Sequence, residues 1–183
     1  MEIIRAQPNP AHLAIAKLAR LVPKLTVITQ NVDDLHERAG STDVIHLHGS
    51  IQRPRCFACS RPHDLADHPN HNELGMCIEP PRCLHCNGKI RPGVVWFGET
   101  LPEASIRAAF AAARHCGCLL SIGTSSVVQP AARIPTVALE HGTTIIHINP
   151  QTVATGHPRE YYLQGSAGDV LPELVSRVSG SGY

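Results

Sequence analysis

Residues 44–50 read Val-Ile-His-Leu-His-Gly-Ser, and this stretch gives the first indication of the fold. Short apolar runs with β-branched residues are typical of strands buried on both faces of a parallel sheet. The run ends in His48 and Gly49, and a glycine lets the backbone approach another group closely. A histidine at the end of a buried strand is a candidate general base, or a histidine that only packs there.

Similar apolar runs occur on both sides of this stretch and alternate with helical patterns. The expected strands cover residues 25–29, 44–47, 118–123 and 143–148, and the expected helices cover residues 11–21, 33–39, 104–115, 135–141 and 169–178. Asn9 before Pro10 suits the start of a helix, and Thr100 followed by Glu103 resembles a capping box. The alternation predicts an α/β fold with a parallel sheet and helices on both faces.

Composition limits the classes of function. The chain has 183 residues, a formal net charge of +1 and 17% charged residues. Its length allows one domain, or one domain with a small insert, and its charge gives no reason to expect nucleic acid or an anionic membrane as partner. No apolar run approaches the ~20 residues of a membrane span, and residues 1–10 do not resemble a signal peptide. We therefore expect a cytoplasmic protein.

Four cysteines form two Cys-x-x-Cys pairs, at Cys56 and Cys59 and at Cys83 and Cys86. Two such turns can present four thiolates to one tetrahedral zinc ion. The alternative of four unconnected cysteines does not explain the paired spacing. The surrounding residues 53–89 lose periodicity and are rich in Cys, Pro, His and Asn. We therefore expect a module held by a closed, structural zinc site.

Polar or small residues follow the expected strands at residues 29–33, 48, 123–125 and 149–151. The carboxyl ends of parallel strands share one edge of the sheet, and sheets of this type bind ligands there. Gln30, Asn31 and Asp33 lie within four residues and need partners, either a polar ligand or a hydrogen-bonded turn. The four strand ends predict one shared crevice.

Two of these strand ends are less specific. Gly123-Thr124-Ser125 could offer backbone N–H groups and hydroxyls to a ribose or phosphate, but many ordinary turns have such a sequence. Asn149 before Pro150 is equally open to a ligand contact or a plain turn. Neither standard phosphate-binding glycine motif is present in the sequence.

The motifs taken together resemble the sirtuin family of NAD-dependent protein-lysine deacylases. They occur in the family's order as TQNVDDLHERAG (29–40), HLHGS (46–50), the two Cys-x-x-Cys pairs, RPGVVWFGE (91–99), IGTSSVVQPAA (122–132) and HIN (147–149). The resemblance extends from about Pro8 to Val178, and the wording of HERAG and RPGVVWFGE is closest to bacterial members.

The resemblance implies a Rossmann-like NAD-binding domain formed by residues 1–52 and 90–178. A zinc-ribbon module of residues 53–89 would be inserted in it, and residues 179–183 would form a flexible tail. The implied activity removes acetyl or related acyl groups from protein lysine side chains. NAD is consumed as co-substrate, nicotinamide and O-acyl-ADP-ribose are released, one zinc ion per chain is structural, and the partner is an acylated-lysine protein or peptide.

The resemblance also implies roles for particular residues. His48 matches the catalytic base, and Asn31 matches a second catalytic residue. The implied cofactor-binding residues are Gln30, Asn31, Val32, Asp33, Gly123, Thr124, Ser125, Asn149, Pro150, Gln151 and Ala167, with Val170 as the alternative to Ala167 beside the adenine. The implied substrate-binding residues are Val95 and Phe97, which line an acyl-lysine tunnel, and Gly98 and Glu99, whose backbone pairs with the peptide. Gln151 departs from the glutamate that the family often has.

Sirtuins begin with a strand and a Gly-Ala-Gly-x-Ser loop that holds the NAD pyrophosphate, and no stretch of these 183 residues matches that segment. We therefore expect a sheet without that first strand. The alternative to a deacylase is a catalytically impaired fragment of a sirtuin that acts only as a zinc-stabilised binding domain.

Overall fold

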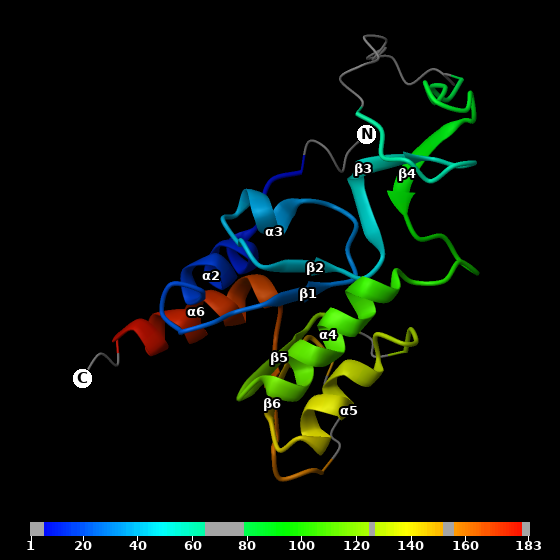
Figure 1. Cartoon of the computed structure of the whole chain (residues 1–183). Helices are drawn as coiled ribbons and strands as arrows, with labels where there is room; N and C mark the ends of the chain where they lie inside the picture. The colour runs from blue at the N-terminus through cyan, green and yellow to red at the C-terminus, as the bar shows by residue number, and fades with distance from the viewer. Residues whose placement is uncertain (1–5, 65–78, 125–126, 152–155, 181–183) are drawn as a thin grey trace.

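The computed structural model of the protein describes residues 6–64, 79–124, 127–151 and 156–180. Helices and parallel strands alternate along the chain and are interrupted by one antiparallel pair (Figure 1). In chain order the elements are α2 (Pro10–Leu18), β1 (Val27–Thr29), α3 (Leu35–Arg38), β2 (Val44–His46), β3 (Gly49–Cys56), β4 (Ile90–Val94), α4 (Glu103–His115), β5 (Cys118–Ile122), α5 (Arg133–Glu140), β6 (Thr144–Asn149), β7 (Glu160–Gln164) and α6 (Ala167–Gly180).

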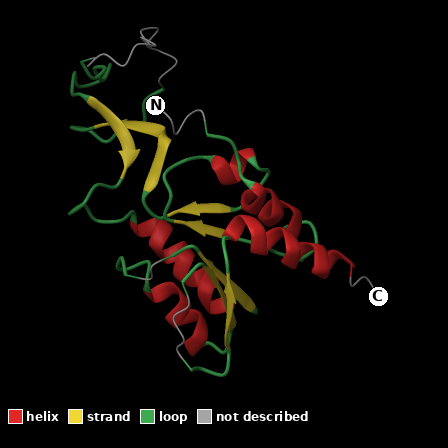
Figure 2. Ribbon diagram, turned by 180° about the vertical axis from the view of Figure 1, so that it is seen from behind, coloured by secondary structure: helices red, strands yellow, loops and turns green. Residues whose placement is uncertain are grey.

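The strands of the described residues form three small sheets. β1 pairs with β2 in parallel, β5, β6 and β7 form a parallel sheet in that order, and β3 pairs with β4 antiparallel. Among the described residues, no ladder joins β1–β2 to β5–β6–β7. The prediction of parallel strands that alternate with helices is confirmed. Figure 2 shows the antiparallel pair beyond the ends of the parallel strands, on the side away from α6.

Two hydrophobic clusters cover the two faces of the parallel strands. One cluster contains Leu47 and buried residues of α4 and α5, and Ile28 and Leu119 pack against it. The other contains buried residues of α2 and α6, and Val27 and Leu120 pack against it. Because successive side chains of a strand point to opposite faces, these neighbouring pairs place the clusters on opposite sides. Both parallel sheets therefore lie between the same two helix layers.

Local chemistry explains where the first helix begins. The Oδ1 atom of Asn9 accepts hydrogen bonds from the backbone N–H groups of Ala11 and His12, at 2.9 and 3.2 Å, and Pro10 occupies the first helical position. These bonds satisfy two of the donors that a helix start leaves unpaired. The predicted role of Asn9 as a cap is confirmed.

The predicted capping box of α4 is wrong. Pro102 occupies the capping position, and no side chain in the described part of the chain makes a capping hydrogen bond at this helix start. Thr100 lies two residues too early for its hydroxyl to take that role.

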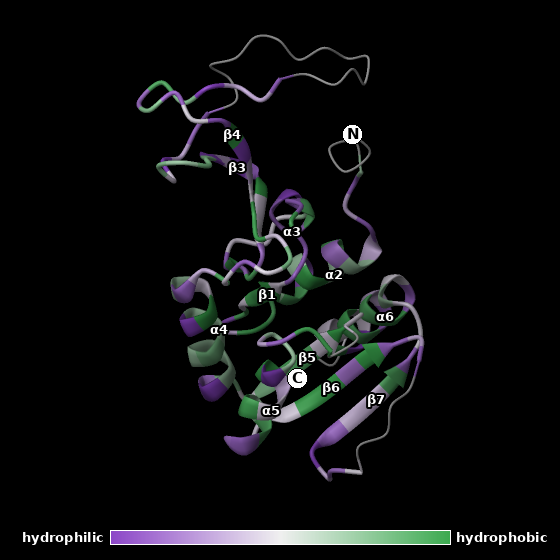
Figure 3. Cartoon of the chain, turned by 90° about the vertical axis from the view of Figure 1, so that its right-hand side faces the viewer, coloured by the Kyte–Doolittle hydropathy of each residue, from purple (hydrophilic) through white to green (hydrophobic). Residues whose placement is uncertain are grey.

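Three strands were not expected from the sequence. β7 has the sequence Glu-Tyr-Tyr-Leu-Gln and forms the edge of its sheet, where Figure 3 shows it as more polar than β6. β3 and β4 carry a proline each, which is unusual within strands. Helix α6 extends to Gly180, so its end overlaps the predicted tail.

The structure also bears on the expectation about the membrane. Among the described residues, no helix has the length and apolar character needed to cross a lipid bilayer.

Candidate active site

His48 lies just past β2 and is positioned by a buried neighbour and by a backbone carbonyl. Leu47 is 1% exposed and anchors the chain in the core formed with α4 and α5. The Nδ1 atom of His48 lies 3.0 Å from the carbonyl oxygen of Gln30, at the end of β1. A carbonyl oxygen only accepts hydrogen bonds, so Nδ1 carries the proton in this contact. The lone pair of the neutral ring is therefore on Nε2, the atom left to act as a base.

Gly49 follows His48 and has φ of +74°. A Cβ atom built at this position would lie 2.1 Å from the carbonyl oxygen of Gly93 in β4. Both the left-handed backbone and the close approach require glycine. The expectation that Gly49 permits close approach is confirmed, and the approach is to β4.

The loop after β1 is held by its own backbone and side chains. The N–H of Asn31 donates to Thr29 Oγ1 at 3.0 Å, and the N–H of Leu35 donates to Asp33 Oδ1 at 3.1 Å. The N–H of Ile51 in β3 donates to the carbonyl oxygen of Val32 at 2.9 Å. The hydrogen-bonded turn that was the alternative reading of this polar cluster is thus present, and it presents Asn31 as an exposed side chain.

The four predicted strand ends come together, because the His48 ring contacts the carbonyl oxygen of Gln30 and the ends of β1, β5 and β6 contact one another. Gln30 Nε2 lies 3.5 Å from Thr124 Oγ1, and Asn149 Nδ2 donates to the carbonyl oxygen of Thr124 at 3.1 Å. Gly123 has φ of +58°, and a Cβ atom there would meet no atom within 4 Å. The ends of β1, β5 and β6, together with His48 after β2, therefore form one half-buried polar edge, whereas Ser125 lies outside the described residues.

The remaining cofactor candidates extend this edge along β6 and β7. The N–H of Gln151 donates to Asn149 Oδ1 at 3.2 Å, and the Nε2 atom of Gln164 donates to the carbonyl oxygen of Pro150 at 3.2 Å. Ala167 begins α6 and packs, like Val170, against the core cluster of α2 and α6.

The four substrate candidates lie on the loop after β4. The N–H of Val95 donates to the carbonyl oxygen of His48 at 2.8 Å, so this loop is joined to the backbone of the candidate base. Phe97 is 107% exposed. Gly98 has φ of +85°, and a Cβ atom there would be in open space. Phe97 therefore projects into solvent rather than lining an enclosed tunnel in this structure.

An ion pair fastens this loop to β4. Both Nη atoms of Arg91 donate to the carboxylate of Glu99, with Nη2 at 2.9 Å from Oε2, and the N–H of Trp96 donates to the same Oε2 at 3.1 Å. The Arg91 guanidinium also lies 4.1 Å from the centre of the Trp96 ring, a cation–π contact. The hydrogen bonds from Arg91 and then from Trp96 lower the pKa of Glu99 to about 2.

The four cysteines converge as predicted, with all four Sγ atoms within 4.8 Å of one another. Zinc–sulfur bonds of about 2.3 Å in a tetrahedron give sulfur–sulfur edges of about 3.8 Å. The Cys56–Cys86 and Cys59–Cys83 sulfur distances are 3.4 and 3.8 Å. The N–H of Cys59, 3.5 Å from Cys56 Sγ, is the main cause that lowers the pKa of Cys56 to about 6. The four residues are therefore positioned to bind one zinc ion.

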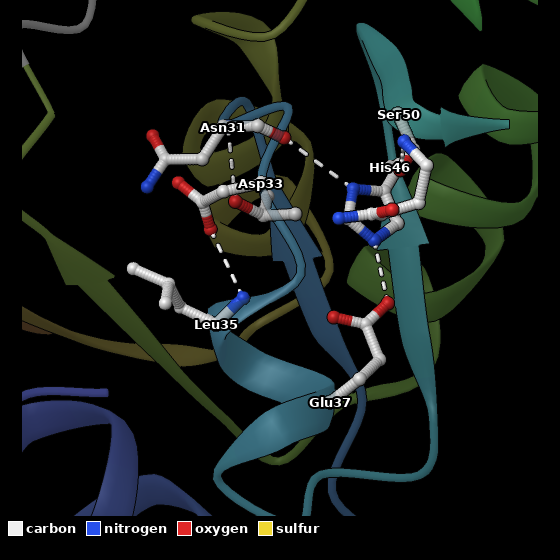
Figure 4. A network of polar contacts seen from close by, with 8 residues as sticks. Asn31, Asp33, Leu35, Glu37, His46 and Ser50 are labelled. Atoms are coloured by element: carbon white, nitrogen blue, oxygen red, sulfur yellow. Dashed lines mark hydrogen bonds and ion pairs between the residues drawn. The ribbon is translucent and has the colours of Figure 1, made fainter. Parts of the chain in front are cut away.

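Two groups near the site were missed by the sequence reasoning. Arg91 had no signal beyond its place in the RPGVVWFGE motif. His46 had a signal in the sequence, because it lies two residues before His48 and the alternation of side chains along a strand places both rings on the same side. Figure 4 shows His46 between Glu37 and the backbone of Asn31.

Comparison with known proteins places these features in a family. Residues 1–130 match the Sir2 family. The chain is 59% identical over 178 residues to NAD-dependent protein deacylase 1 of Pseudomonas aeruginosa, which covers 97% of this chain and 71% of that protein. It is 45% identical over 179 residues to the NAD-dependent protein deacylase of Pyrococcus furiosus, at 97% and 70% coverage.

Solved structures give the same result. A Sir2 homologue in complex with NAD superposes with a TM-score of 0.85 at 44% identity and covers 98% of this chain and 68% of that one. Sir2Af2 bound to a myristoylated histone peptide superposes with a TM-score of 0.80 at 39% identity, at 96% and 73% coverage. The chain therefore belongs to the Sir2 family.

Proposed function

We propose that this chain is an NAD-dependent protein-lysine deacylase, which transfers the acyl group of an acylated lysine to ADP-ribose and releases nicotinamide. The observation that carries the proposal is the position of His48 at the polar edge, with its Nε2 lone pair uncommitted by the Gln30 contact. The names of the relatives, all NAD-dependent protein deacylases, support the reaction class.

The polar edge fits the ribose parts of NAD. Its donors and acceptors are the amides of Gln30 and Asn149, the Thr124 hydroxyl and the backbone at Gly123. Neutral amides and hydroxyls match the hydroxyl groups of a ribose, which both donate and accept hydrogen bonds. We assign Gln30, Asn31, Val32 and Asp33 to the nicotinamide end of the site, and the remaining cofactor residues to its other end: Gly123, Thr124, Ser125, Asn149, Pro150, Gln151 and Ala167.

NAD supplies a carbon that becomes electrophilic as nicotinamide leaves. The protein's part is to orient the two reactants and to move a proton. Nε2 of His48 accepts a proton from a ribose hydroxyl, while the carbonyl of Gln30 holds the ring in the required tautomer. Asn31, exposed at the start of its loop, is assigned to orient the reacting groups.

The loop after β4 is the proposed binding site of the acyl-lysine peptide. Its backbone at Gly98 and Glu99 would pair with an extended peptide as an added strand. Phe97 and Val95 would contact the acyl chain, and the full exposure of Phe97 leaves its ring available to be covered by the substrate. The relative bound to a myristoylated histone peptide supports a substrate of this kind.

We also propose the division of the chain that the sequence predicts. Residues 1–52 and 90–178 would form the NAD-binding domain, residues 53–89 the zinc module and residues 179–183 a tail. The β3–β4 pair, which carries Cys56, reaches beyond 53–89 at both ends. A reducing cytoplasm would keep the four thiols available for zinc, so we propose that location.

The proposal is tested by incubating the chain with NAD and an acetyl-lysine peptide and measuring nicotinamide. We expect peptide-dependent release, reduced by about 10²- to 10⁴-fold in His48→Ala because a general base is lost. His141→Ala is a matched control, since the Nδ1 atom of His141 also lies 2.8 Å from a backbone carbonyl, that of Val137 at the end of α5. Equal release by His48→Ala would refute the role of His48. Calorimetric binding of the peptide without any release would favour the zinc-stabilised binding domain instead.

A further inference from the structure

His46 makes two polar contacts that the assigned site residues do not explain. Its Nε2 atom lies 2.7 Å from Glu37 Oε1 in α3, and its Nδ1 atom lies 3.3 Å from the carbonyl oxygen of Asn31 (Figure 4). The His46 side chain is 11% exposed, and that of Glu37 is 39% exposed. The imidazole thus bridges a helix and the loop of the nicotinamide end.

Both partners of the ring are acceptors. A carbonyl oxygen cannot donate, and an ionised carboxylate cannot donate either. Both contacts are hydrogen bonds at the same time only when both ring nitrogens carry protons, so the bridge requires an imidazolium. Burial opposes the charge of Glu37, but the hydrogen bond from His46 lowers the pKa of Glu37 below its ordinary value. The carboxylate that balances the imidazolium is therefore favoured.

His46 is among the residues that line a cavity of about 410 Å³ between β2, β3 and the start of α4. A side chain is held in one rotamer more firmly where directional bonds fix it than where it only packs. The contacts to Glu37 and Asn31 provide those bonds.

The carbonyl that His46 holds is next to the one that His48 holds. Gln30 and Asn31 are consecutive, and their carbonyl oxygens contact the two histidines of the same strand end. The next carbonyl oxygen along the chain, that of Val32, accepts a hydrogen bond from the N–H of Ile51 in β3 at 2.9 Å. Three consecutive carbonyls of the loop are therefore held by His48, His46 and β3, and the bridge supplies the middle contact.

We propose that His46 and Glu37 form a positioning pair that sets the path of the loop of residues 30–33 and thereby the nicotinamide end of the NAD site. The inference rests on the proposed function for its connection to NAD, but the position of the loop can be measured without any turnover. Neither residue is proposed to touch NAD or the reacting atoms.

The first measurement is hydrogen–deuterium exchange of the amides at the two ends of this loop, Asn31 and Leu35, whose N–H groups donate to Thr29 Oγ1 and Asp33 Oδ1. We expect exchange about tenfold faster in His46→Ala, because hydrogen bonds to charged groups are among the stronger ones. The His46→Gln side chain can donate to one of the two acceptors but carries no charge, and Glu37→Gln keeps an acceptor without the charge. The exchange rates of these two variants should lie between those of His46→Ala and the unchanged protein.

The second measurement is the KM for NAD, which we expect to rise about tenfold in His46→Ala, with the KM for the acyl peptide within twofold of the unchanged protein. A KM for NAD in His46→Gln that lies closer to that of the unchanged protein would show that the hydrogen bonds of the side chain, and not its volume alone, position the loop. If His46→Ala fails to fold, as judged by its unfolding midpoint and zinc content, His46→Gln and Glu37→Gln decide the matter alone.

His147→Gln is the matched control. His147 Nε2 lies 2.9 Å from Glu160 Oε1, and His147 precedes the site residue Asn149 by two positions, as His46 precedes His48. Its ring stacks on Tyr162 of β7 instead of reaching the loop. Loop exchange and the KM for NAD should be unchanged in this variant.

The outcomes separate the two proposals. Unchanged loop exchange in both His46→Gln and Glu37→Gln would overturn the positioning pair, and so would faster exchange with an unchanged KM for NAD. No turnover by the unchanged protein, combined with faster loop exchange in the variants, would count against the proposed deacylase while the pair's control of the loop stands.

Discussion

Gly49 joins the candidate base to the antiparallel pair at a point where no other residue fits. Its backbone has φ of +74°, and its Cα hydrogens face the carbonyl oxygen of Gly93, so both conformation and space exclude a Cβ atom. The position of His48 is therefore determined on one side by the buried Leu47 and on the other by a backbone contact that needs glycine.

Two effects make Gly49 necessary, the left-handed backbone conformation and the close approach of Gly93, and their contributions to the unfolding free energy can be separated. Gly142 also has a positive φ, +81°, but a Cβ atom there would meet nothing within 4 Å. We expect Gly142→Ala to cost about 1–2 kcal/mol of unfolding free energy from the left-handed backbone alone. Gly49→Ala should cost clearly more, because the new Cβ would overlap the Gly93 carbonyl oxygen, and it should also reduce turnover. Denaturant unfolding of both variants measures the difference, and equal losses would contradict the close approach.

At the scale of elements, the β4 strand and the loop that follows it act as one unit. Arg91 in β4 is 9% exposed, and it binds Glu99 and the carbonyl oxygen of Val94 while its guanidinium covers Trp96. The preceding residue, Ile90, is in register with the zinc-site residue Cys56. The candidate substrate loop is thus connected through one short strand to the four-cysteine cluster.

Trp96 is the single tryptophan of the chain and reports directly on this unit. We expect Glu99→Gln to change the Trp96 emission at pH 7 and to raise the KM for the acyl peptide several-fold, because the loop loses a charged anchor. The KM for NAD should be unchanged. Glu79→Gln is the matched control, since Glu79 pairs with Arg82 at 2.7 Å and both side chains are exposed. An unchanged peptide KM in Glu99→Gln would refute the anchoring role.

The same pair has a defined dependence on pH. The pKa of Glu99 is lowered from 4.5 to about 2 by its bonds to Arg91 and Trp96. A lowered pKa means that the contribution of the pair to stability is fully present above about pH 4.5 and is lost as the pH falls toward 2. Trp96 emission should therefore be constant from pH 6 to 9 and change only in the acid range. A transition near neutral pH that Glu99→Gln abolishes would contradict this assignment.

The antiparallel pair should depend on zinc more than any other element. Its core cluster consists of Cys56, Cys83 and Ile90, so two of its three buried members are candidate zinc ligands. We expect removal of zinc with a chelator to unfold β3 and β4 while the amides of α2 and α6 stay protected. Cys59→Ser should lower zinc content in the same way, and Cys116→Ser, whose sulfur lies outside the cluster, should not. Zinc analysis and amide exchange measure both effects.

How far the sequence predicts these elements depends on local signals. β1, β2, β5 and β6 are continuous apolar runs and were predicted, because strands covered by helices on both faces need such runs. β7 was missed because an edge strand needs no such run, and its short stretch Tyr-Tyr-Leu is enclosed by the polar residues Glu160 and Gln164. β3 and β4 were missed because their pairing depends on Gly49, Gly93 and the cysteine cluster rather than on periodicity.

At the scale of the whole molecule, two separate cores stabilise the same set of strands. The cluster on the side of α4 and α5 includes Ile134, and the cluster on the side of α2 and α6 includes Ile148. Ile28 and Leu119, from different sheets, pack against the first cluster, and Val27 and Leu120 pack against the second. The helix layers therefore unite two parallel sheets that share no ladder among the described residues.

This arrangement predicts additive effects across the sheet. Ile134→Val and Ile148→Val should each cost about 0.5–1.5 kcal/mol of unfolding free energy. The double variant should equal their sum within about 0.5 kcal/mol, because the two side chains share no partners. A single unfolding transition in all three variants would show that both cores belong to one cooperative unit. Strong coupling between the two substitutions would indicate one continuous core instead.

The site itself was predictable only in part, for a reason that also belongs to this scale. The cysteines can be recognised by their spacing, and the strand ends can be recognised by their polar residues. The sequence does not show which strand ends lie together in the fold. The contacts of Gln30 and Asn149 with Thr124 are made across the fold. The His46–Glu37 pair was missed because its two members are ordinary on their own, and only their meeting with the Asn31 carbonyl makes them informative.

The two imidazoles at the end of β2 are held by main-chain oxygens of Gln30 and Asn31, and this affects how the site can be dissected. Alanine scanning of the loop removes side chains and leaves both main-chain oxygens in place, so it would not test these contacts. Chemical synthesis offers a direct route. An amide-to-ester replacement of the bond after Gln30 weakens its carbonyl as an acceptor and should loosen the His48 ring, while every side chain of the protein stays unchanged. It also removes the Asn31 N–H that donates to Thr29 Oγ1, so Thr29→Val, which loses only that acceptor, is the control.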